Sequence, residues 1–381
     1  MRKEIGKKVS DHLRKFPGFS FPAPSEEEWD LKLFEAPFSL TDEEGEVLAN
    51  VMPYFESARD IAGRMGRDPK DVIPLLDSLV KKLWVFSEGT GEDRRYEAHT
   101  CQFEFYMPWL TPESVARLLT PIAASAANPD PKEVEFNQRP IGTGDDEMLP
   151  YLRVVPRESS LPYDTEILPS EIVSHIIEHA GEKGIAVTEC LCRKIKQSMG
   201  GSCSYNAPLD ICLFFEPFAQ AAIEAGVAKP ITKAEAHEIV KRAREYGLVH
   251  QAATAEHTRI LCSCCPDCCG ALQPFLLGAR AYGYTMKSNF YSSVKPERCR
   301  GALDCVKKCP ANAITYDPEK RTAVVETEKC IGCGICVESC KNGALELKRR
   351  EKVIKYPHTN ADHWEINARQ RGKTELMKNG R

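Results

Sequence analysis

The residues best suited to chemistry in this chain are its cysteines. The sequence holds 17 cysteines in 381 residues, and all but one of them lie between positions 190 and 340. Five occur within the stretch CSCCPDCC, residues 262–269. This density exceeds what one disulfide or one catalytic thiol needs, and thiolate sulfur is a preferred ligand for iron and zinc. The cysteines therefore predict metal centres.

The most specific cysteine pattern lies near the C-terminus, where two similar half-motifs follow each other at a distance of about thirty residues. The second half, CIGCGICVESC, has the spacing C-x2-C-x2-C-x3-C. The first half, CRGALDCVKKCP, has only three cysteines and carries Ala302 at its second position. The cysteines of the two halves are Cys299, Cys305, Cys309, Cys330, Cys333, Cys336 and Cys340.

This segment, about residues 296–347, resembles the bacterial two-cluster ferredoxins. The resemblance implies that the last cysteine of each half binds the cluster of the other half. One complete [4Fe–4S] site would use Cys309, Cys330, Cys333 and Cys336. The second site would use Cys299, Cys305 and Cys340. Because Ala302 has no ligand atom, a [3Fe–4S] cluster, a [4Fe–4S] cluster with one open iron, and an empty site stay open as alternatives there.

A second group of cysteines lies in the middle of the chain. Its nine members are Cys190, Cys192, Cys203, Cys212, Cys262, Cys264, Cys265, Cys268 and Cys269. They come from two regions about fifty residues apart. Each region follows a predicted strand, at 185–190 and at 248–255, and the second of these strands follows a predicted helix at 232–247, so both regions can meet at one edge of a small sheet. Nine thiolates suffice for one or two further [4Fe–4S] clusters. Zinc, free thiols and disulfides are the alternatives for this block.

The middle region and the C-terminal segment together resemble uncharacterised multi-cluster ferredoxin-like proteins of anaerobes. The tripeptide CCG, residues 268–270, is also similar to the cysteine-rich domains of heterodisulfide-reductase-type enzymes, although their wider spacing is absent. Arg193 and Lys194 follow the first two middle cysteines. These cations either raise the reduction potential of a neighbouring cluster or form an exposed basic turn.

The composition is that of an ordinary globular protein, with 42% hydrophobic and 28% charged residues. The net charge of −4 argues against a global attraction to nucleic acid or to an anionic membrane. No apolar run approaches the roughly 18 residues that a membrane span needs, and the basic N-terminus lacks the apolar stretch of a secretory signal. We therefore expect a cytoplasmic protein without membrane insertion, where cysteines serve as metal ligands rather than disulfides.

The elements that must position these sites predict an α+β protein with several domains. Helical periodicity begins at Thr41, whose spacing to Glu44 is that of a capping box, and a further helix starts at Asp68. The predicted segments are an N-terminal arm (1–40), a winged-helix-like domain (41–100), a helix with a Pro-rich linker (101–150), a cysteine-rich α/β metal-binding domain (151–290), a dicluster ferredoxin domain (291–347) and a basic, solvated tail (348–381).

The segment that resembles a winged helix allows two uses, DNA binding and protein docking. Its would-be recognition helix, residues 68–83, carries Lys70, Lys81 and Lys82 against Asp68, Asp71 and Asp77. This gives no excess of positive charge, whereas contact with DNA phosphates needs one. Docking of a protein partner is therefore the preferred interpretation.

Together these features predict a multi-cluster iron–sulfur electron-transfer protein that passes electrons between cytoplasmic redox partners in an anaerobe. Its partners would be a reductase, a dehydrogenase or a hydrogenase. One alternative is an iron–sulfur oxidoreductase subunit that holds substrate at an open-coordinated cluster, and another is a redox-sensing winged-helix transcription regulator. The sequence contains no nucleotide-binding glycine loop, so no catalytic residue and no cofactor beyond the clusters is assigned.

Overall fold

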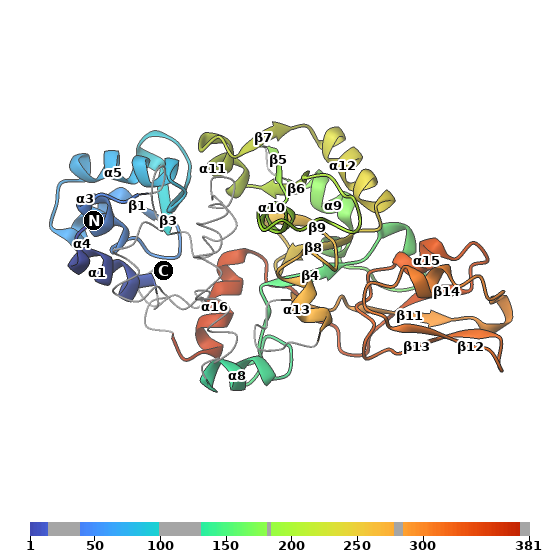
Figure 1. Ribbon diagram of the computed structural model, residues 1–381. Coiled ribbons are helices and arrows are strands. Elements are labelled where there is room, and N and C mark those ends of the chain that lie inside the picture. The colour runs from blue at the N-terminus through green and yellow to red at the C-terminus, as the bar shows by residue number, and fades with distance from the viewer. Residues whose placement is uncertain (14–38, 99–130, 181–183, 278–284, 374–381) are drawn as a thin grey trace.

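The structure is a computed structural model of the chain, and it describes residues 1–13, 39–98, 131–180, 184–277 and 285–373. Helices and sheets are mixed along three consecutive regions, which Figure 1 shows side by side as an N-terminal lobe, a central sheet with its helices, and a C-terminal lobe. Helix α16 (Asn360–Gln370) follows the C-terminal lobe and returns toward the centre of the molecule. Cys101, the one cysteine outside residues 190–340, and the helix expected in the first part of the segment 101–150 lie outside the described residues.

Within residues 1–13 and 39–98, the N-terminal lobe packs four helices against a small antiparallel sheet of strand order β1-β3-β2. The elements are α1 (Lys3–Leu13), α3 (Asp42–Leu48), β1 (Glu56–Ser57), α4 (Ala58–Met65), α5 (Pro69–Lys81), β2 (Val85–Glu88) and β3 (Arg95–Ala98). The predicted capping box of Thr41 and Glu44 is confirmed, and Asp68 caps α5 as expected. Helix α1, whose Val9 and Leu13 are fully buried in the core of the lobe, lies within the predicted arm and was not expected.

The central region is a seven-stranded sheet of order β10-β4-β8-β9-β6-β5-β7. Its strands are β4 (Leu152–Val155), β5 (Ile185–Glu189), β6 (Asp210–Phe215), β7 (Ala228–Ile231), β8 (Val249–Ala253), β9 (Ile260–Cys264) and β10 (Thr285–Met286). All neighbouring strands are antiparallel except β10 and β4. The expectation of an α/β middle region is therefore wrong in its sheet type, because antiparallel strands predominate over parallel crossovers.

Five helices accompany this sheet: α9 (Val173–Glu178), α10 (Leu191–Ser198), α11 (Phe218–Glu224), α12 (Lys233–Glu245) and α13 (Leu272–Leu276). The predicted strands at 185–190 and 248–255 occur as β5 and β8, and the helix predicted between Thr232 and Gly247 occurs as α12. Strands β6 and β9, which carry three of the middle cysteines, were not predicted. Their long apolar runs lack the alternation that identifies a half-buried strand.

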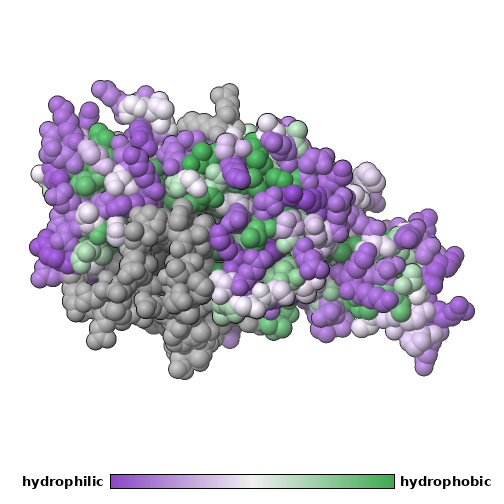
Figure 2. Space-filling view, turned by 45° about the horizontal axis from the view of Figure 1, so that its top comes forward, coloured by the Kyte–Doolittle hydropathy of each residue, from purple (hydrophilic) through white to green (hydrophobic). Residues whose placement is uncertain are grey.

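The C-terminal lobe repeats a short helix followed by a strand. Its elements are β11 (Phe290–Val294), α14 (Asp304–Lys307), β12 (Ile314–Asp317), β13 (Thr322–Val325), α15 (Ile335–Ser339) and β14 (Leu345–Arg349). Strand β11 pairs with β14 and β12 pairs with β13, both antiparallel. In Figure 2 this lobe is the narrow end at the right, where hydrophilic residues cover most of the visible face.

Two segments expected to lack a packed structure contain helices. Helix α8 (Pro131–Gln138) lies within the predicted linker. The prediction of a solvated tail is wrong for residues 360–370, since Trp364 of α16 is buried and stacks on Tyr151 at 5.4 Å between ring centroids. Buried apolar side chains, which the basic composition of the tail conceals, hold α16 on the central region. No helix in the described parts of the chain has the length and apolar character needed to cross a bilayer.

The N-terminal lobe contacts the central region through buried side chains. Phe86 of β2 stacks on Phe218 of α11 with ring centroids 4.4 Å apart. Arg259 and Glu97 form a buried ion pair at 3.0 Å next to this stack. The lobe is therefore packed against the central region through side-chain contacts.

Candidate metal centres

The complete site of the C-terminal lobe is formed by Cys309, just after α14, and by Cys330, Cys333 and Cys336 around the start of α15. Burial raises the pKa of Cys333, and the thiolates of Cys336, Cys330 and Cys309 raise it further. Burial likewise raises the pKa of Cys336 to about 12, with added effects from Cys330 and Cys309. Buried thiols in this arrangement ionise only when a cation replaces their protons, as a metal does.

Hydrogen bonds in this site point at the sulfurs. The backbone N–H of Ser292 donates to Cys330 Sγ at 3.3 Å, and that of Ala313 donates to Cys309 Sγ at 3.3 Å. The Ser292 hydroxyl lies 3.3 Å from Cys336 Sγ. The two backbone N–H groups stabilise thiolate sulfur, as donors around the ligands of iron–sulfur clusters do. The residues present therefore fit a [4Fe–4S] cluster.

The incomplete site is a small cavity. Cys299, Cys305 and Cys340 line a space of about 170 Å³, and Ala302 lies on its wall. The backbone N–H of Ala344 donates to Cys340 Sγ at 3.2 Å, which repeats the contact of Ala313 with Cys309. The two halves thus present equivalent sulfurs, and the first half lacks one ligand.

The nine middle cysteines come from neighbouring strands of the central sheet and from the loops that follow them. Strands β6 and β9 are paired with Leu213 opposite Leu261, so the next residues in this register set Cys212 beside Cys262. Cys190 directly follows β5, the strand next to β6. The expectation that the two regions meet at the sheet is in agreement with this register, although the strand that presents the second region, β9, was not the predicted one.

Six of these cysteines form what we call the six-cysteine set: Cys190, Cys192, Cys212, Cys262, Cys264 and Cys269. Their thiols interact in a continuous series, from Cys190 to Cys212, Cys262, Cys264, Cys269 and Cys192. Gln251 Nε2 donates to Cys264 Sγ at 3.0 Å, and the backbone N–H of Gly270 donates to Cys192 Sγ at 3.4 Å. Six sulfurs exceed the four that one tetrahedral ion takes, so this set suits a centre with more than one metal.

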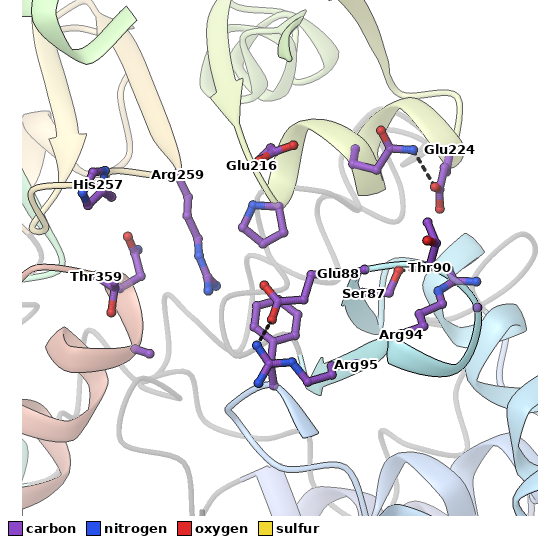
Figure 3. A pocket seen from close by; sticks show the side chains of 17 residues that line it. Ser87, Glu88, Thr90, Arg94, Arg95, Glu216, Glu224, His257, Arg259 and Thr359 are labelled. Carbon is purple, nitrogen blue, oxygen red and sulfur yellow. Dashed lines mark hydrogen bonds and ion pairs between the residues drawn. The ribbon is translucent and has the colours of Figure 1, made fainter. Parts of the chain in front are cut away.

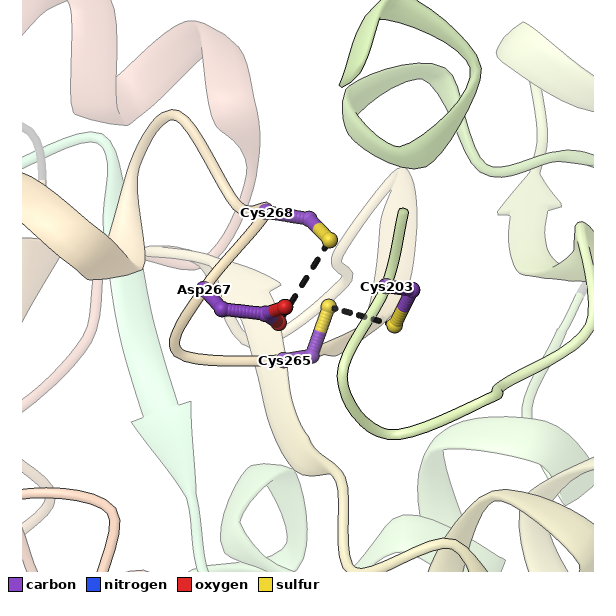
Figure 4. Close-up of side chains that lie close together, drawn as sticks. All are labelled: Cys203, Cys265, Asp267 and Cys268. Atoms are coloured by element: carbon purple, nitrogen blue, oxygen red, sulfur yellow. Dashed lines mark hydrogen bonds between the residues drawn. The ribbon is translucent and has the colours of Figure 1, made fainter. Parts of the chain in front are cut away.

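The other three middle cysteines form a separate group with an aspartate, which we call the Asp267 set: Cys203, Cys265, Asp267 and Cys268. Figure 4 shows Cys203 facing the loop that carries the other three side chains. Cys203 Sγ lies 3.6 Å from Cys265 Sγ, and Cys268 Sγ lies 3.4 Å from Asp267 Oδ1. Asp267 was not predicted as a ligand, although its place between two cysteine pairs in CCPDCC was an available signal.

Arg193 lies between the two sets and is fully buried. Its Nη2 donates to the carbonyl of Ser263 at 2.7 Å, and its Nη1 donates to that of Pro208 at 2.9 Å. Burial lowers the pKa of Arg193, but the thiolates of Cys190, Cys265 and Cys212 raise it, and the net effect is a rise. The alternative of an exposed basic turn is therefore wrong for Arg193. Nearby negative charge stabilises a buried guanidinium, and thiolates bound to a metal would supply it.

The six-cysteine set adjoins the complete site of the C-terminal lobe. Cys264 and Cys269 of the six-cysteine set share one buried apolar cluster with Cys333 of the C-terminal lobe and with Ile331. The backbone N–H of Arg157 donates to the carbonyl of Cys333 at 3.0 Å, and its guanidinium pairs with Glu338 on α15. Electrons passing between the two regions would therefore cross packed protein rather than bulk water.

A cavity of about 790 Å³ lies away from the cysteines, where the N-terminal lobe, α11 and the start of α16 meet (Figure 3). Arg94, Arg95 and Arg259 line it together with Glu88, Glu216 and Glu224. Arg95 pairs with Glu88 and Arg259 pairs with Glu97, so much of its charge is balanced internally. No site was predicted here from the sequence.

Comparison with known proteins supports the C-terminal centre. Residues 292–341 match the family model of the 4Fe–4S dicluster domain. The chain is 41% identical over 51 residues to a sulfite dehydrogenase subunit of Allochromatium vinosum, covering 13% of this chain and 21% of that protein. It is 48% identical over 40 residues to a tetrathionate reductase subunit of Archaeoglobus fulgidus, covering 10% and 19%.

A third relative is the polyferredoxin-like subunit of the aliphatic sulfonate oxidoreductase of Pyrococcus furiosus, 45% identical over 47 residues, which cover 12% of this chain and 27% of that protein. The chain thus spans about a fifth to a quarter of the length of these curated relatives. No solved structure matches the chain. The expectation of a 4Fe–4S domain at the C-terminus is confirmed: residues 292–341 form a 4Fe–4S dicluster domain, in a chain whose curated relatives include subunits of oxidoreductases.

Proposed function

We propose that this protein is a multi-cluster iron–sulfur electron carrier that links redox partners in the cytoplasm of an anaerobe. The observation that carries the proposal is the shared apolar cluster that holds Cys264, Cys269 and Cys333. Electron transfer between two centres needs packed protein between them, and this shared cluster of side chains provides it. Clusters bound at these cysteines would accept and release single electrons.

The proposed iron ligands are thirteen of the sixteen cysteines expected from the sequence as metal ligands. Cys309, Cys330, Cys333 and Cys336 hold a [4Fe–4S] cluster at the complete site, and the six-cysteine set holds a further iron–sulfur centre. At Cys299, Cys305 and Cys340 we propose a [3Fe–4S] cluster, because three sulfurs line a cavity and the fourth position is Ala302. This half-site lies in the lobe at the far end of the molecule, a suitable place for a redox partner to dock.

The N-terminal lobe serves in this proposal as a docking module of winged-helix type. Its element order from α3 to β3 is helix, strand, two helices and two strands, as in that fold. Arg94 and Arg95 of the β2–β3 hairpin pair with Asp77 and Glu88 within the lobe. Cations already engaged in this way are poor candidates for phosphate contacts, so the DNA-binding regulator is the less favoured function.

The second candidate function is an oxidoreductase subunit. The specific observation in its favour is the cavity of about 170 Å³ beside the three cysteines of the incomplete site. A small substrate could reach an open iron there. The carrier is preferred, because the family match is to a dicluster domain and electron transfer between clusters needs no substrate site.

The test is the redox chemistry of the full-length protein purified without oxygen. We expect iron and acid-labile sulfide, reversible reduction by dithionite, and electron paramagnetic resonance signals that broaden or split when neighbouring clusters are reduced together. The protein should also carry electrons from dithionite-reduced methyl viologen to an acceptor such as cytochrome c.

Two matched variants sharpen this test. Cys333→Ser should lower the iron content and abolish the magnetic coupling between the C-terminal and middle centres. The reason is that Cys333 is a proposed iron ligand and also belongs to the apolar cluster of side chains that the two centres share. Cys101→Ser, which changes the cysteine outside the predicted ligands, should leave both unchanged. A folded protein without iron and sulfide would refute the proposed function. Spin signals that neither broaden nor split at any stage of reduction would refute the proposal that neighbouring clusters exchange electrons.

A further inference from the structure

The Asp267 set differs from every other group of cysteines in the described chain in its compactness. The ligand atoms of Cys203, Cys265, Asp267 and Cys268 all lie within 4.8 Å of one another, and the described residues contain no other group of three or more such donors at this spacing. The cysteines of the dicluster domain are therefore more widely spread. A cluster of four irons separates its thiolates, whereas a single ion draws its ligands together.

The spacing agrees with one tetrahedral ion. With zinc–sulfur bonds of about 2.3 Å, the ligands of such an ion stand about 3.8 Å apart. Cys203 Sγ and Cys265 Sγ are 3.6 Å apart, and Cys268 Sγ and Asp267 Oδ1 are 3.4 Å apart. Three sulfurs and one carboxylate oxygen also complete the four positions of a closed structural zinc site.

The surroundings of Asp267 orient it as a ligand that uses one oxygen. Its Oδ2 accepts hydrogen bonds from the backbone N–H of Ser204 at 2.7 Å, from the Ser204 hydroxyl at 2.9 Å and from Lys196 Nζ at 3.0 Å. Its Oδ1 remains on the side of the thiols. A coordinating carboxylate is characteristically held in this way, with one oxygen on the metal and the other fixed by neighbouring donors.

The charges around the set also suit a divalent ion. Three thiolates and one carboxylate carry four negative charges, and one divalent cation leaves two. Lys196 binds Asp267 on one side, and the buried guanidinium of Arg193 lies beside Cys265 on the other. These two cations compensate the remaining charge, so a closed and partly buried site is electrostatically stable.

We propose that Cys203, Cys265, Cys268 and Asp267 bind a single zinc ion, separate from the iron–sulfur centres. This inference rests on the proposed function only in leaving the remaining cysteines to iron. The ion joins the loop before β6, which carries Cys203, to the loop after β9, which carries the other three ligands. Its role is to hold together the part of the central region that presents the six-cysteine set.

The test is metal analysis of the full-length protein purified without oxygen. We expect about one zinc per chain beside iron and sulfide, with an X-ray absorption fine structure of three sulfurs at about 2.3 Å and one oxygen at about 2.0 Å. Zinc well below one per chain, in protein that contains iron and sulfide, overturns the zinc site and leaves the electron carrier standing. Zinc in a protein that contains no iron supports the zinc site and overturns the electron carrier. Zinc bound by four sulfurs excludes Asp267 as a ligand.

Variants separate this ion from the clusters. Cys268→Ser should remove zinc and leave iron and sulfide unchanged, whereas Cys264→Ser, in the six-cysteine set, should lower iron and sulfide and leave zinc in place. Loss of iron and sulfide from Cys268→Ser would assign the set to a cluster and overturn the proposal.

A milder pair of variants tests the orientation of Asp267 without removing a ligand. Lys196→Met should weaken zinc binding about ten- to a hundred-fold against a competing chelator, the usual effect of losing a group that orients a ligand. Lys194→Met removes an exposed cation that pairs with Glu189 and should leave zinc affinity unchanged. Equal zinc affinity in both variants would contradict the assignment of Asp267 as a ligand.

Discussion

Ala302 stands where the first half of the dicluster domain would carry its second cysteine, and it lines the cavity formed with Cys299, Cys305 and Cys340. Around it the backbone and the other sulfurs match those of the complete half, down to the N–H donors of Ala313 and Ala344. A single side chain therefore decides whether this site offers four sulfur ligands or three.

Ala302→Cys should restore the fourth ligand. If the site holds a [3Fe–4S] cluster, the oxidised wild-type protein has its spin signal, and the variant loses that signal while gaining about one iron per chain. Electron paramagnetic resonance and iron analysis measure both changes. Ala302→Val, which adds volume without a thiol, is the control. An unchanged iron content in Ala302→Cys would mean that the site holds no three-iron cluster.

The protonation of His363 should make the free energy of unfolding depend on pH. His363 is buried in α16, and burial lowers its pKa to about 4 even though the carbonyls of Pro150 and Leu149 favour the protonated ring. The unfolded chain, with an ordinary histidine pKa of about 6.5, takes up a proton that the folded chain does not. The stability contributed by the neutral ring is thus complete above about pH 6.5 and is lost as the pH falls toward 4.

His363→Gln should remove this dependence. Between pH 7 and pH 5 the free energy of unfolding of the wild-type protein should fall by about 2 kcal/mol more than that of the variant. Urea unfolding without oxygen at the two pH values measures the difference. His358→Gln changes an exposed histidine paired with Glu256 and serves as control. An equal fall in His363→Gln and wild type would show that His363 is protonated in the folded state.

At the scale of elements, the loop that precedes α15 owes its shape to glycine. Gly332 has a φ of +71°, and a Cβ atom there would lie 2.2 Å from the carbonyl oxygen of Phe290 on β11. Only glycine combines the left-handed conformation with so close an approach of two backbones. The path of the backbone between Cys330 and Cys333 thus depends on β11 as well as on the loop itself.

Gly332→Ala should displace this loop from β11 and reduce the iron bound at the complete site, with a loss of stability of about 1–3 kcal/mol from backbone strain alone. Iron analysis and thermal unfolding measure the two effects. Gly270→Ala is the matched control from the other cysteine-rich loop, because a Cβ atom there meets nothing within 4 Å. Similar iron contents in the two variants would contradict this account of the loop.

At the scale of the whole molecule, the N-terminal lobe and the central region meet at one buried ion pair. Arg259 donates to both oxygens of Glu97, at 3.1 and 3.0 Å, beside the stacked rings of Phe86 and Phe218. Burial raises the pKa of Glu97, and the charge of Arg259 opposes that rise. Loss of one partner would leave the other charge buried without compensation.

Glu97→Gln should therefore destabilise the contact between the lobe and the central region by about 3–5 kcal/mol. We expect faster hydrogen exchange in β3 and in α11, with unchanged iron content because the cysteines lie elsewhere. Glu88→Gln removes an exposed pair with Arg95 and should cost about 0–1 kcal/mol. Unchanged exchange at the contact in Glu97→Gln would show that the apolar stacking alone holds the lobe.

The sequence by itself determined the features that depend on near neighbours. The spacing of Cys330, Cys333 and Cys336 places three sulfurs in one short loop, and it predicted the dicluster domain that the family match confirms. The helix cap at Thr41 and helix α12 could also be predicted, because the sequence patterns that indicate them lie within a few residues. Strand β9 could not be predicted, since a short, mostly apolar segment such as ILCSC fits a buried strand and a buried helix equally.

Only the tertiary structure decided how the nine middle cysteines divide. Cys203 meets Cys265 across 62 positions of sequence, and Arg193 lies buried between thiols rather than at the surface. The same holds for α16, where Trp364 packs on Tyr151 from the far end of the chain. The physical reason is that such contacts depend on strand register and on the burial of apolar surface, which are properties of the folded chain as a whole and not of any local pattern.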